Sequence, residues 1–294
     1  MKIAILLLCH KNPDQINLFI KQMRNKSIDI FVHVDKKSNI VENIVKADNV
    51  YILPEEKRVD VAWASISQIE ATHNLIISAR SINNYDYYWL CSGQDFPLKS
   101  CQDILAFLST NKNLNYLNFF TSRQNGLDKD NNYDKRNSIF YFDFLMGREK
   151  WKRIFRRCYV ALTGGYNYTF PWLKRKYKGF KFYFGSQWWC INKDTMNWII
   201  EYEKNNNDYF TYYSHCSTPD ESYYHTLVMN SPYAKDCTDY LHCIVWPEGS
   251  PSPKILTIDD KALLFNTSYL MARKFDINID SEIVRVLSDR IKEC

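Results

Sequence analysis

Two adjacent carboxylates in Thr218-Pro219-Asp220-Glu221 are the side chains best suited to proton transfer in this chain of 294 residues. Thr218 fits the N-cap of a helix and Pro219 its first position, so we expect both acids in the first turn of a helix over residues 220–229. Acids at a helix start complement the positive end of the helix dipole and need no further role. Alternatively, Glu221 is a general base, because a helix start holds a carboxylate rigidly near a hydroxyl group.

Two adjacent cations lie in Met271-Ala272-Arg273-Lys274-Phe275-Asp276. Neighbouring side chains of a strand point to opposite faces, so one of these cations can reach the ligand-binding edge of a sheet. There it would bind a phosphate group. The other interpretation is a solvated surface pair, which is common for basic side chains.

Metal ligands are sparse in the sequence. Asp128-Lys129-Asp130 places two acids at i and i+2 in an expected loop, where Asp-rich turns are also ordinary. His33 and Asp35 would share one face of a strand, but a metal site needs at least a third ligand. The glycine patterns of P-loop kinases, Rossmann dehydrogenases and α/β-hydrolases are absent, which counts against those three classes.

The elements that must position these residues alternate between strand and helix patterns in the first 120 residues. We expect strands over 3–8, 29–34, 49–52, 85–91 and 115–120, and helices over 14–23, 63–79 and 103–108. Such repeated units indicate a mainly parallel sheet with helices on both faces. Ligands then bind at the carboxyl ends of the strands, which are Cys9-His10, Asp35-Lys36 and Ser92-Gly93-Gln94-Asp95.

The second half of the chain is less regular. Residues 121–136 read as a polar loop, and residues 180–192 as a strand pair or one bulged strand. Helices are expected over 194–204 and 220–229, and a short strand followed by a terminal helix between 273 and 291. The sequence shows no internal repeat and no linker, so we expect one domain over residues 1–294.

Charge is unevenly distributed along the chain. Residues 148–181 hold eleven basic residues and one acid, a charge of +10 that leaves −5 for the rest of a chain with a total of +5. That total is too small to indicate nucleic-acid binding. Aromatic residues interleave with the cations, so the segment suits the headgroup layer of an anionic membrane. A solvated helical face with its apolar side in the core is the open alternative.

Cysteine usage indicates the compartment. The nine cysteines are scattered singly without a C-x-x-C pair, which favours reduced thiols over disulfides or a zinc ribbon. The apolar run at residues 3–9 is followed by no cleavage site and reads as a strand, and no apolar stretch is long enough to span a membrane. We therefore expect a cytoplasmic protein, with the inner face of the cell membrane as a further option.

Six segments in order resemble one family, the core-2/I-branching β-1,6-N-acetylglucosaminyltransferase and protein xylosyltransferase family (glycosyltransferase family 14), in a bacterial-type version. The matching segments are 30–38 with His33-Val34-Asp35, 61–65 with Trp63, 88–99 with Ser92-Gly93-Gln94-Asp95-Phe96-Pro97, Gly185-Ser186-Gln187-Trp188-Trp189, Pro219-Asp220-Glu221, and Ala272-Arg273-Lys274-Phe275-Asp276. The resemblance implies a GT-A-like α/β fold. Residues 1–121 would form its nucleotide-sugar-binding half and residues 122–294 its acceptor and catalytic half.

The resemblance also implies roles for individual residues. Glu221 becomes the catalytic base. The donor would contact Asp35 through its uracil, together with Trp63 and Asp95, and its diphosphate would bind Lys274 assisted by Arg273. Bacterial relatives carry an arginine that also serves the diphosphate a few residues before a tryptophan. When this chain is aligned on Trp246, His242 stands at the position of that arginine. Either His242 or Lys254 would therefore complete the diphosphate site. The acceptor side is assigned to Gly185, Ser186, Gln187 and Trp188.

The implied function is an inverting transfer from a UDP-sugar to a hydroxyl group of a glycan, with β-linkage and without a divalent metal or other cofactor. N-acetylglucosamine is the favoured sugar and xylose the second. A lipid-linked glycan on an anionic membrane is one acceptor that the basic segment would suit, and no nucleic acid is expected. The alternatives are a metal-dependent GT-A transferase that uses Asp128 and Asp130, and a carbohydrate-binding protein without catalysis.

Overall fold

The computed structural model describes residues 1–121, 133–162, 175–250 and 252–292. Their strands are β1 (Ile3–Cys9), β2 (Ile28–Val34), β3 (Val50–Ile52), β4 (Tyr87–Ser92), β5 (Asp95–Pro97), β6 (Asn115–Tyr116), β7 (Cys190–Asn192), β8 (Cys237–Thr238), β9 (His242–Ile244) and β10 (Met271–Arg273). Their α-helices are α1 (Pro13–Gln22), α2 (Ser67–Ile82), α3 (Cys101–Thr110), α4 (Tyr133–Ser138), α5 (Lys150–Leu162), α6 (Lys193–Asn205), α7 (Asn207–Tyr213), α8 (Tyr223–Met229), α9 (Lys261–Asn266) and α10 (Glu282–Lys292).

The main sheet has seven strands in the order β3-β2-β1-β4-β7-β6-β8. The four strands β3, β2, β1 and β4 are parallel, whereas β7 is antiparallel to both of its neighbours, β4 and β6. This mostly parallel, mixed sheet with helices on both faces confirms the predicted α/β, GT-A-like fold. From β1 the chain first builds β2 and β3 on one side and then β4 on the other, so the strand order reverses beside β1. A crevice opens at such a point.

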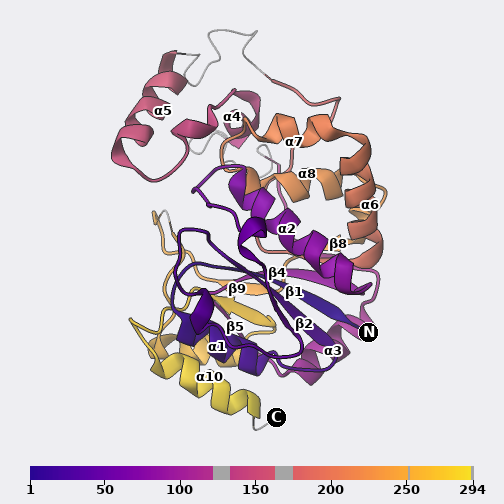
Figure 1. Cartoon of the computed structure of the whole chain (residues 1–294), viewed down its shortest axis with the longest axis vertical. Helices are drawn as coiled ribbons and strands as arrows, with labels where there is room; N and C mark the ends of the chain where they lie inside the picture. Colours follow the sequence, from indigo (N-terminus) through magenta and orange to yellow (C-terminus); the bar gives the residue numbers. More distant parts are fainter. Residues whose placement is uncertain (122–132, 163–174, 251, 293–294) are drawn as a thin grey trace.

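Strand β1 shows why both faces of the sheet are covered. Ile3, Ile5 and Leu7 belong to one buried cluster, while Ala4 and Leu6 belong to another. Helices α1, α3 and α10 cover the first face, and α2, α6, α7 and α8 cover the second (Figure 1). Because successive side chains of a strand alternate between faces, a strand buried on both sides must be apolar throughout, as β1 is.

A second, three-stranded sheet has the order β5-β10-β9, with β10 antiparallel to β5 and parallel to β9. Strand β5 begins only three residues after β4 ends, so the short turn between them joins the two sheets. The pair Arg273 and Asp95 lies in register between β10 and β5. This register brings Arg273 and the adjacent Lys274 to the carboxyl end of the main sheet.

Several predicted elements begin or end elsewhere in the structure. The helix predicted from residue 63 begins at Ser67, because Ala64 has a left-handed backbone (φ 63°) that a helix excludes. The helix predicted over 220–229 is divided into a 3₁₀ turn, η6 (Pro219–Glu221), and α8. Thr218 precedes Pro219 as expected, but its backbone is left-handed (φ 55°) and its side chain makes no capping hydrogen bond.

Two predicted strands are shorter than expected. The strand over 115–120 pairs at Asn115–Tyr116 and again through a single bridge between Phe120 and Phe184. Residues 180–192 hold that bridge and β7 rather than a strand pair. The eight cysteines in the described segments are free thiols, as predicted. None of the helices in those segments combines the length and the apolar character that a membrane span needs.

Candidate active site

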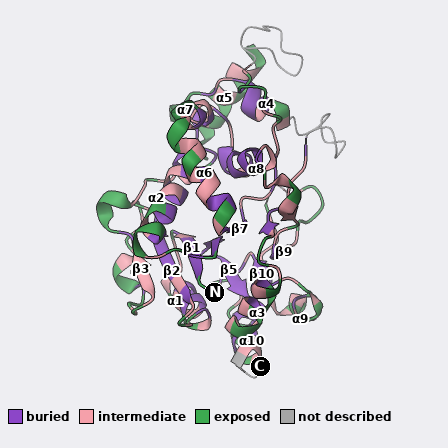
Figure 2. Cartoon of the chain, turned by 90° about the vertical axis from the view of Figure 1, so that its right-hand side faces the viewer, coloured by how far each residue is buried: buried purple, intermediate pink, exposed green. Residues whose placement is uncertain are grey.

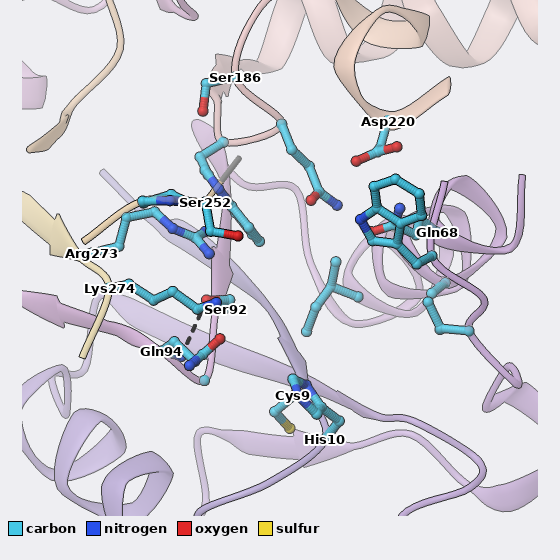
Figure 3. Close-up of a pocket in the computed structure, with 18 of the residues that line it drawn as sticks. Cys9, His10, Gln68, Ser92, Gln94, Ser186, Asp220, Ser252, Arg273 and Lys274 are labelled. Carbon is cyan, nitrogen blue, oxygen red and sulfur yellow. Dashed lines mark hydrogen bonds between the residues drawn. The ribbon is translucent and has the colours of Figure 1, made fainter. Parts of the chain in front are cut away.

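A cavity of about 330 Å³ opens at the carboxyl ends of β1, β2 and β4 (Figure 3). Cys9, His10 and Lys11 reach it from β1, and Ser92, Gly93 and Gln94 from the turn after β4. The topology of the sheet predicts a ligand site at this edge, and its volume lies in the range of small-molecule pockets.

The structure brings eight of the predicted site residues to the cavity wall. They are Asp35, Trp63, Ser186, Gln187, Trp188, Glu221, Arg273 and Lys274. Asp95 and His242 lie beneath the wall with no exposed surface, while Gly185 and Lys254 lie beside it. Residues that the sequence did not single out complete the lining, among them Lys11, Gln68, Arg148, Trp246 and Ser252.

The acidic pair, Asp220 and Glu221, belongs to the turn η6, and both residues line the cavity. Figure 3 shows Asp220 on the same side of the cavity as Gln68 of α2. The Glu221 carboxylate is 36% exposed and forms an ion pair with Arg136 from α4. The backbone carbonyl of Glu221 accepts a hydrogen bond of 2.9 Å from Gly185. The backbone amide of Glu221 donates a second hydrogen bond, of 3.2 Å, to the carbonyl of Thr218. One salt bridge and two backbone hydrogen bonds therefore fix the position of Glu221, while its side chain stays accessible from the cavity.

Asp220 lies in a different environment, although it is the next residue. Its carboxyl group is buried, and one of its oxygens has no hydrogen-bond partner among the described residues. Burial, with the negative charge of Glu221 as a second cause, raises the pKa of Asp220 to about 7. A hydrogen bond from Gln68 and the charge of Arg136 act in the opposite direction and are weaker. Near neutral pH, Asp220 therefore holds its proton much more strongly than an ordinary aspartate.

The basic wall, Arg273 and Lys274, reaches the cavity from the other side (Figure 3). The guanidinium of Arg273 stacks over the ring of Trp188 at 3.9 Å. Burial lowers the pKa of Lys274, and the positive charges of Arg273, Lys11 and Arg148 lower it further. Several cations close enough to repel one another make this wall suited to a group with more than one negative charge.

A buried carboxylate, Asp95, supports the basic wall from below. It accepts hydrogen bonds of 2.8 Å from the backbone amide and the hydroxyl of Ser92, and it lies 3.4 Å from Arg273 Nη1 and from His242 Nε2. Burial raises the pKa of Asp95, but the charge of Arg273, the nearby ring of His242 and the hydrogen bonds from Ser92 outweigh it, so the pKa is lowered. An ionised Asp95 therefore holds Arg273 in place.

Neither candidate for the additional diphosphate ligand touches the cavity. His242 is fully buried against the rings of Trp89 and Trp188, and burial lowers its pKa, so it is neutral at physiological pH. Lys254 Nζ lies 2.6 Å from Asp260 Oδ1 instead. The positions that do bring further cations to the wall are Lys11 and Arg148.

Cys91, Asp95 and His242 are the one group in the described segments whose ligand atoms lie close enough together, within 4.8 Å, to hold a metal ion. Its surroundings do not suit a cation. Arg273 already brings a positive charge to Asp95, and burial keeps the pKa of the Cys91 thiol well above its usual value. Asp128 and Asp130, the pair considered for metal binding, lie outside the described residues.

Trp63 lines the cavity at its edge and is 44% exposed. Two guanidinium groups, those of Arg148 and Arg156, each lie 5.8 Å from the centre of its ring. Gly185 is explained by close packing rather than by ligand contact. A Cβ atom there would lie 1.9 Å from the carbonyl oxygen of Asn118 and 2.7 Å from the ring of His225.

The comparison with known proteins gives one family. The model of the Core-2/I-Branching enzyme family matches residues 3–263. Xylosyltransferase 2 of Canis lupus familiaris is 23% identical over 319 aligned positions, which cover 98% of this chain and 33% of that protein. Xylosyltransferase 1 of Rattus norvegicus is 22% identical over 97% of this chain and 35% of its own length. The chain thus spans about a third of the length of the curated relatives it matches.

The environment of Asp220 predicts a pH-dependent stability. Because its raised pKa means that the folded state binds the proton more tightly than the unfolded chain, Asp220 stabilises the fold at acidic pH, and this contribution is lost as the pH rises through about 7. Asp220→Asn removes the charge and should raise Tm by about 2–4 °C at about pH 8, with a smaller effect at about pH 5. Thermal unfolding at both pH values measures this.

The control is Asp259→Asn, at an exposed position. We expect it to shift Tm only slightly, and by the same amount at both pH values. A Tm for Asp220→Asn that falls at the alkaline pH, or changes equally at both, would contradict the assignment.

Proposed function

Because this chain belongs to the Core-2/I-branching enzyme family, a family of glycosyltransferases, we propose that it transfers a sugar from a UDP-sugar to a hydroxyl group of a glycan acceptor. The observation that carries this proposal is the polarity of the cavity. An accessible carboxylate stands at one side and a basic wall at the other, so one site can accept a proton and stabilise an anionic leaving group.

Glu221 is the proposed base. Its carboxylate is partly exposed at the cavity and ion-paired with Arg136, whereas its neighbour Asp220 is buried and has a pKa raised to about 7. A general base must be ionised and within reach of the hydroxyl group. Glu221 is accessible to a hydroxyl group bound in the cavity, and Arg136 orients its carboxylate. The acceptor oxygen would lose its proton to Glu221 as it attacks the anomeric carbon.

The leaving group is the proposed partner of the basic wall. As the bond from the anomeric carbon to the diphosphate breaks, negative charge grows on UDP, and cations that are already in place stabilise this transition state more than the ground state. Lys274 would contact the diphosphate directly. Arg273 would contribute its charge from a position fixed by Asp95 and Trp188. On this basis we propose that catalysis needs no divalent metal.

The remaining cavity positions fit the donor and the acceptor. Asp35 lies at the end of β2, where it would accept hydrogen bonds from the uracil, and Trp63 offers an exposed ring at the edge of the cavity. Ser186, Gln187 and Trp188 would line the acceptor side. Attack from the side opposite the diphosphate inverts the anomeric carbon, so an α-linked donor gives a β-linked product.

The identity of the sugar is the finer part of the proposal. N-acetylglucosamine is the sugar favoured by the sequence. Xylose is the second candidate, because the relatives named above are xylosyltransferases.

Release of UDP from UDP-N-acetylglucosamine and from UDP-xylose tests the sugar and the metal together. We expect turnover with N-acetylglucosamine as the preferred donor, and we expect it to persist in EDTA. Turnover with UDP-xylose alone would replace the favoured sugar by the second. Activity that EDTA abolishes and Mn²⁺ restores would instead support a metal-dependent reaction that uses Asp128 and Asp130. Binding of sugars without turnover would favour a carbohydrate-binding protein.

Glu221→Gln keeps the shape of the side chain and removes its basicity. We expect kcat to fall about 10²–10⁴-fold, the usual contribution of a positioned base, with little change in KM for the donor. The matched comparison is Asp220→Asn in the adjacent position, which should lose much less. A larger loss in Asp220→Asn than in Glu221→Gln would transfer the role of the base to Asp220.

Lys274→Met and Lys254→Met distinguish the two lysines considered for the diphosphate. Lys274→Met removes a cation from the cavity wall and should lower kcat by about 10²-fold while it weakens UDP binding. Lys254→Met breaks a partly exposed ion pair with Asp260 and should change kcat by less than about threefold. Equal losses in the two variants would show that Lys254 also serves the donor.

A further inference from the structure

Helix α5 has an inward face, an apolar face and a basic face, at the 100° per residue of an α-helix. The inward face contains the four half-buried residues of the helix, Lys152, Arg156, Tyr159 and Val160. It is fixed by a hydrogen bond of 3.0 Å from Arg156 to the carbonyl of Leu145. No residue of α5 is buried, and the helix lies at one end of the longest axis of the molecule (Figures 1 and 2).

The second face is apolar but lies in solvent. Trp151, Ile154, Phe155 and Leu162 recur at helical spacing and are between 50% and 75% exposed. A water-soluble helix of this kind normally turns its apolar stripe toward the core. In α5 the apolar stripe points away from the core, which contradicts the alternative of a solvated face with its apolar side packed inside.

The patch extends beyond the helix. Phe142 and Phe144, from the turn that precedes α5, are also exposed. Their rings lie 5.5 Å apart, and the ring of Phe142 lies 5.6 Å from that of Tyr159 on α5. This turn thus adds two exposed aromatic rings next to α5, which they contact through Tyr159. Contiguous apolar patches of this kind mark interaction sites.

The third face is basic. Lys150, Arg153 and Arg157 are exposed beside the apolar stripe and form no ion pair with the described residues. The helix itself contains no acidic residue. Two copies of this chain that met through this face would bring the same cations together, which disfavours a symmetric dimer here. Anionic lipid offers both an apolar layer and negative charge.

We propose that the outer face of α5, with Phe142 and Phe144, binds the surface of an anionic membrane. The apolar side chains would enter the boundary between headgroups and acyl chains, and Lys150, Arg153 and Arg157 would contact the lipid phosphates. Binding of this kind is peripheral and needs no membrane-spanning helix.

The position of α5 gives this contact a consequence for the proposed transfer reaction. Arg148 lines the cavity two residues before α5 begins, and Arg156 from α5 packs on Trp63 at the edge of the cavity. A membrane bound to α5 would therefore lie close to the site of sugar transfer. This step rests on the proposed function and points to an acceptor glycan carried on a lipid.

Co-sedimentation of the full chain with phosphatidylcholine vesicles, with and without phosphatidylglycerol, tests the membrane contact without any sugar donor. We expect the partition coefficient to be about tenfold or more higher on the anionic vesicles, and to fall when the salt concentration is raised from about 0.1 M to about 1 M. Trp151→Ser/Phe155→Ser should lower it about tenfold. Lys150→Glu/Arg153→Glu/Arg157→Glu should lower it on the order of a hundredfold.

The controls make the same changes elsewhere on the surface. Ile77→Ser/Ile82→Ser removes two exposed apolar side chains of α2, and Lys21→Glu/Arg24→Glu/Lys26→Glu reverses three exposed cations near α1. Both should bind vesicles like the unchanged protein. Circular dichroism and Tm establish that each variant is folded.

Four results would overturn the proposal: no binding to anionic vesicles, equal binding to neutral ones, binding that the α5 substitutions leave unchanged, or a dimer in size-exclusion chromatography that these substitutions dissociate. If the protein binds vesicles but releases no UDP, the membrane contact stands and the proposed sugar transfer fails.

Discussion

The buried charge of Asp95 is the constraint on which the site depends. Its carboxylate lies at the start of β5, where the main sheet passes into the second sheet, and it is satisfied by Ser92 from β4, His242 from β9 and Arg273 from β10. An ionised group without exposed surface must be compensated, and loss of one partner of such a group costs about 3–5 kcal/mol. The interaction that joins the two sheets therefore also fixes the position of Arg273 and of the adjacent Lys274.

The opposite side of the cavity is built by a different principle. There, two neighbouring carboxyl groups have different surroundings. Both line the cavity, but Glu221 is partly exposed and paired with Arg136, whereas Asp220 is buried. The left-handed backbone at Thr218 begins the tight turn, and its amide bonds to the carbonyl of Ala64, which is also left-handed. Two unusual backbone positions thus connect the turn that carries the acids to the segment that carries Trp63.

The sequence predicted the parallel half of the sheet well, because strands such as β1 are apolar on both faces and end in polar residues that mark the cavity. Lys11 could also have been predicted as a cavity residue, because it lies just after the end of β1. Other features have no signal in the sequence. Arg136 pairs with Glu221 from 85 positions away, and nothing local indicates such a contact. Either His242 or Lys254 was expected to complete the diphosphate site. Burial of His242 and the ion pair of Lys254 with Asp260, which both depend on the tertiary fold, keep these residues away from the cavity.

Trp63 is shared between the cavity and α5. Its side chain lines the cavity, and its ring contacts Arg148 and Arg156. Arg156 belongs to α5. Two ligands that bind through a common neighbour are thermodynamically linked, and the linkage is reciprocal. If a membrane bound at α5 changes the affinity of the cavity for its ligand by some factor, a ligand in the cavity changes the affinity of α5 for the membrane by the same factor. If the proposed membrane contact and the proposed donor favour each other through Trp63, the protein would stay at the membrane longer when the donor is bound.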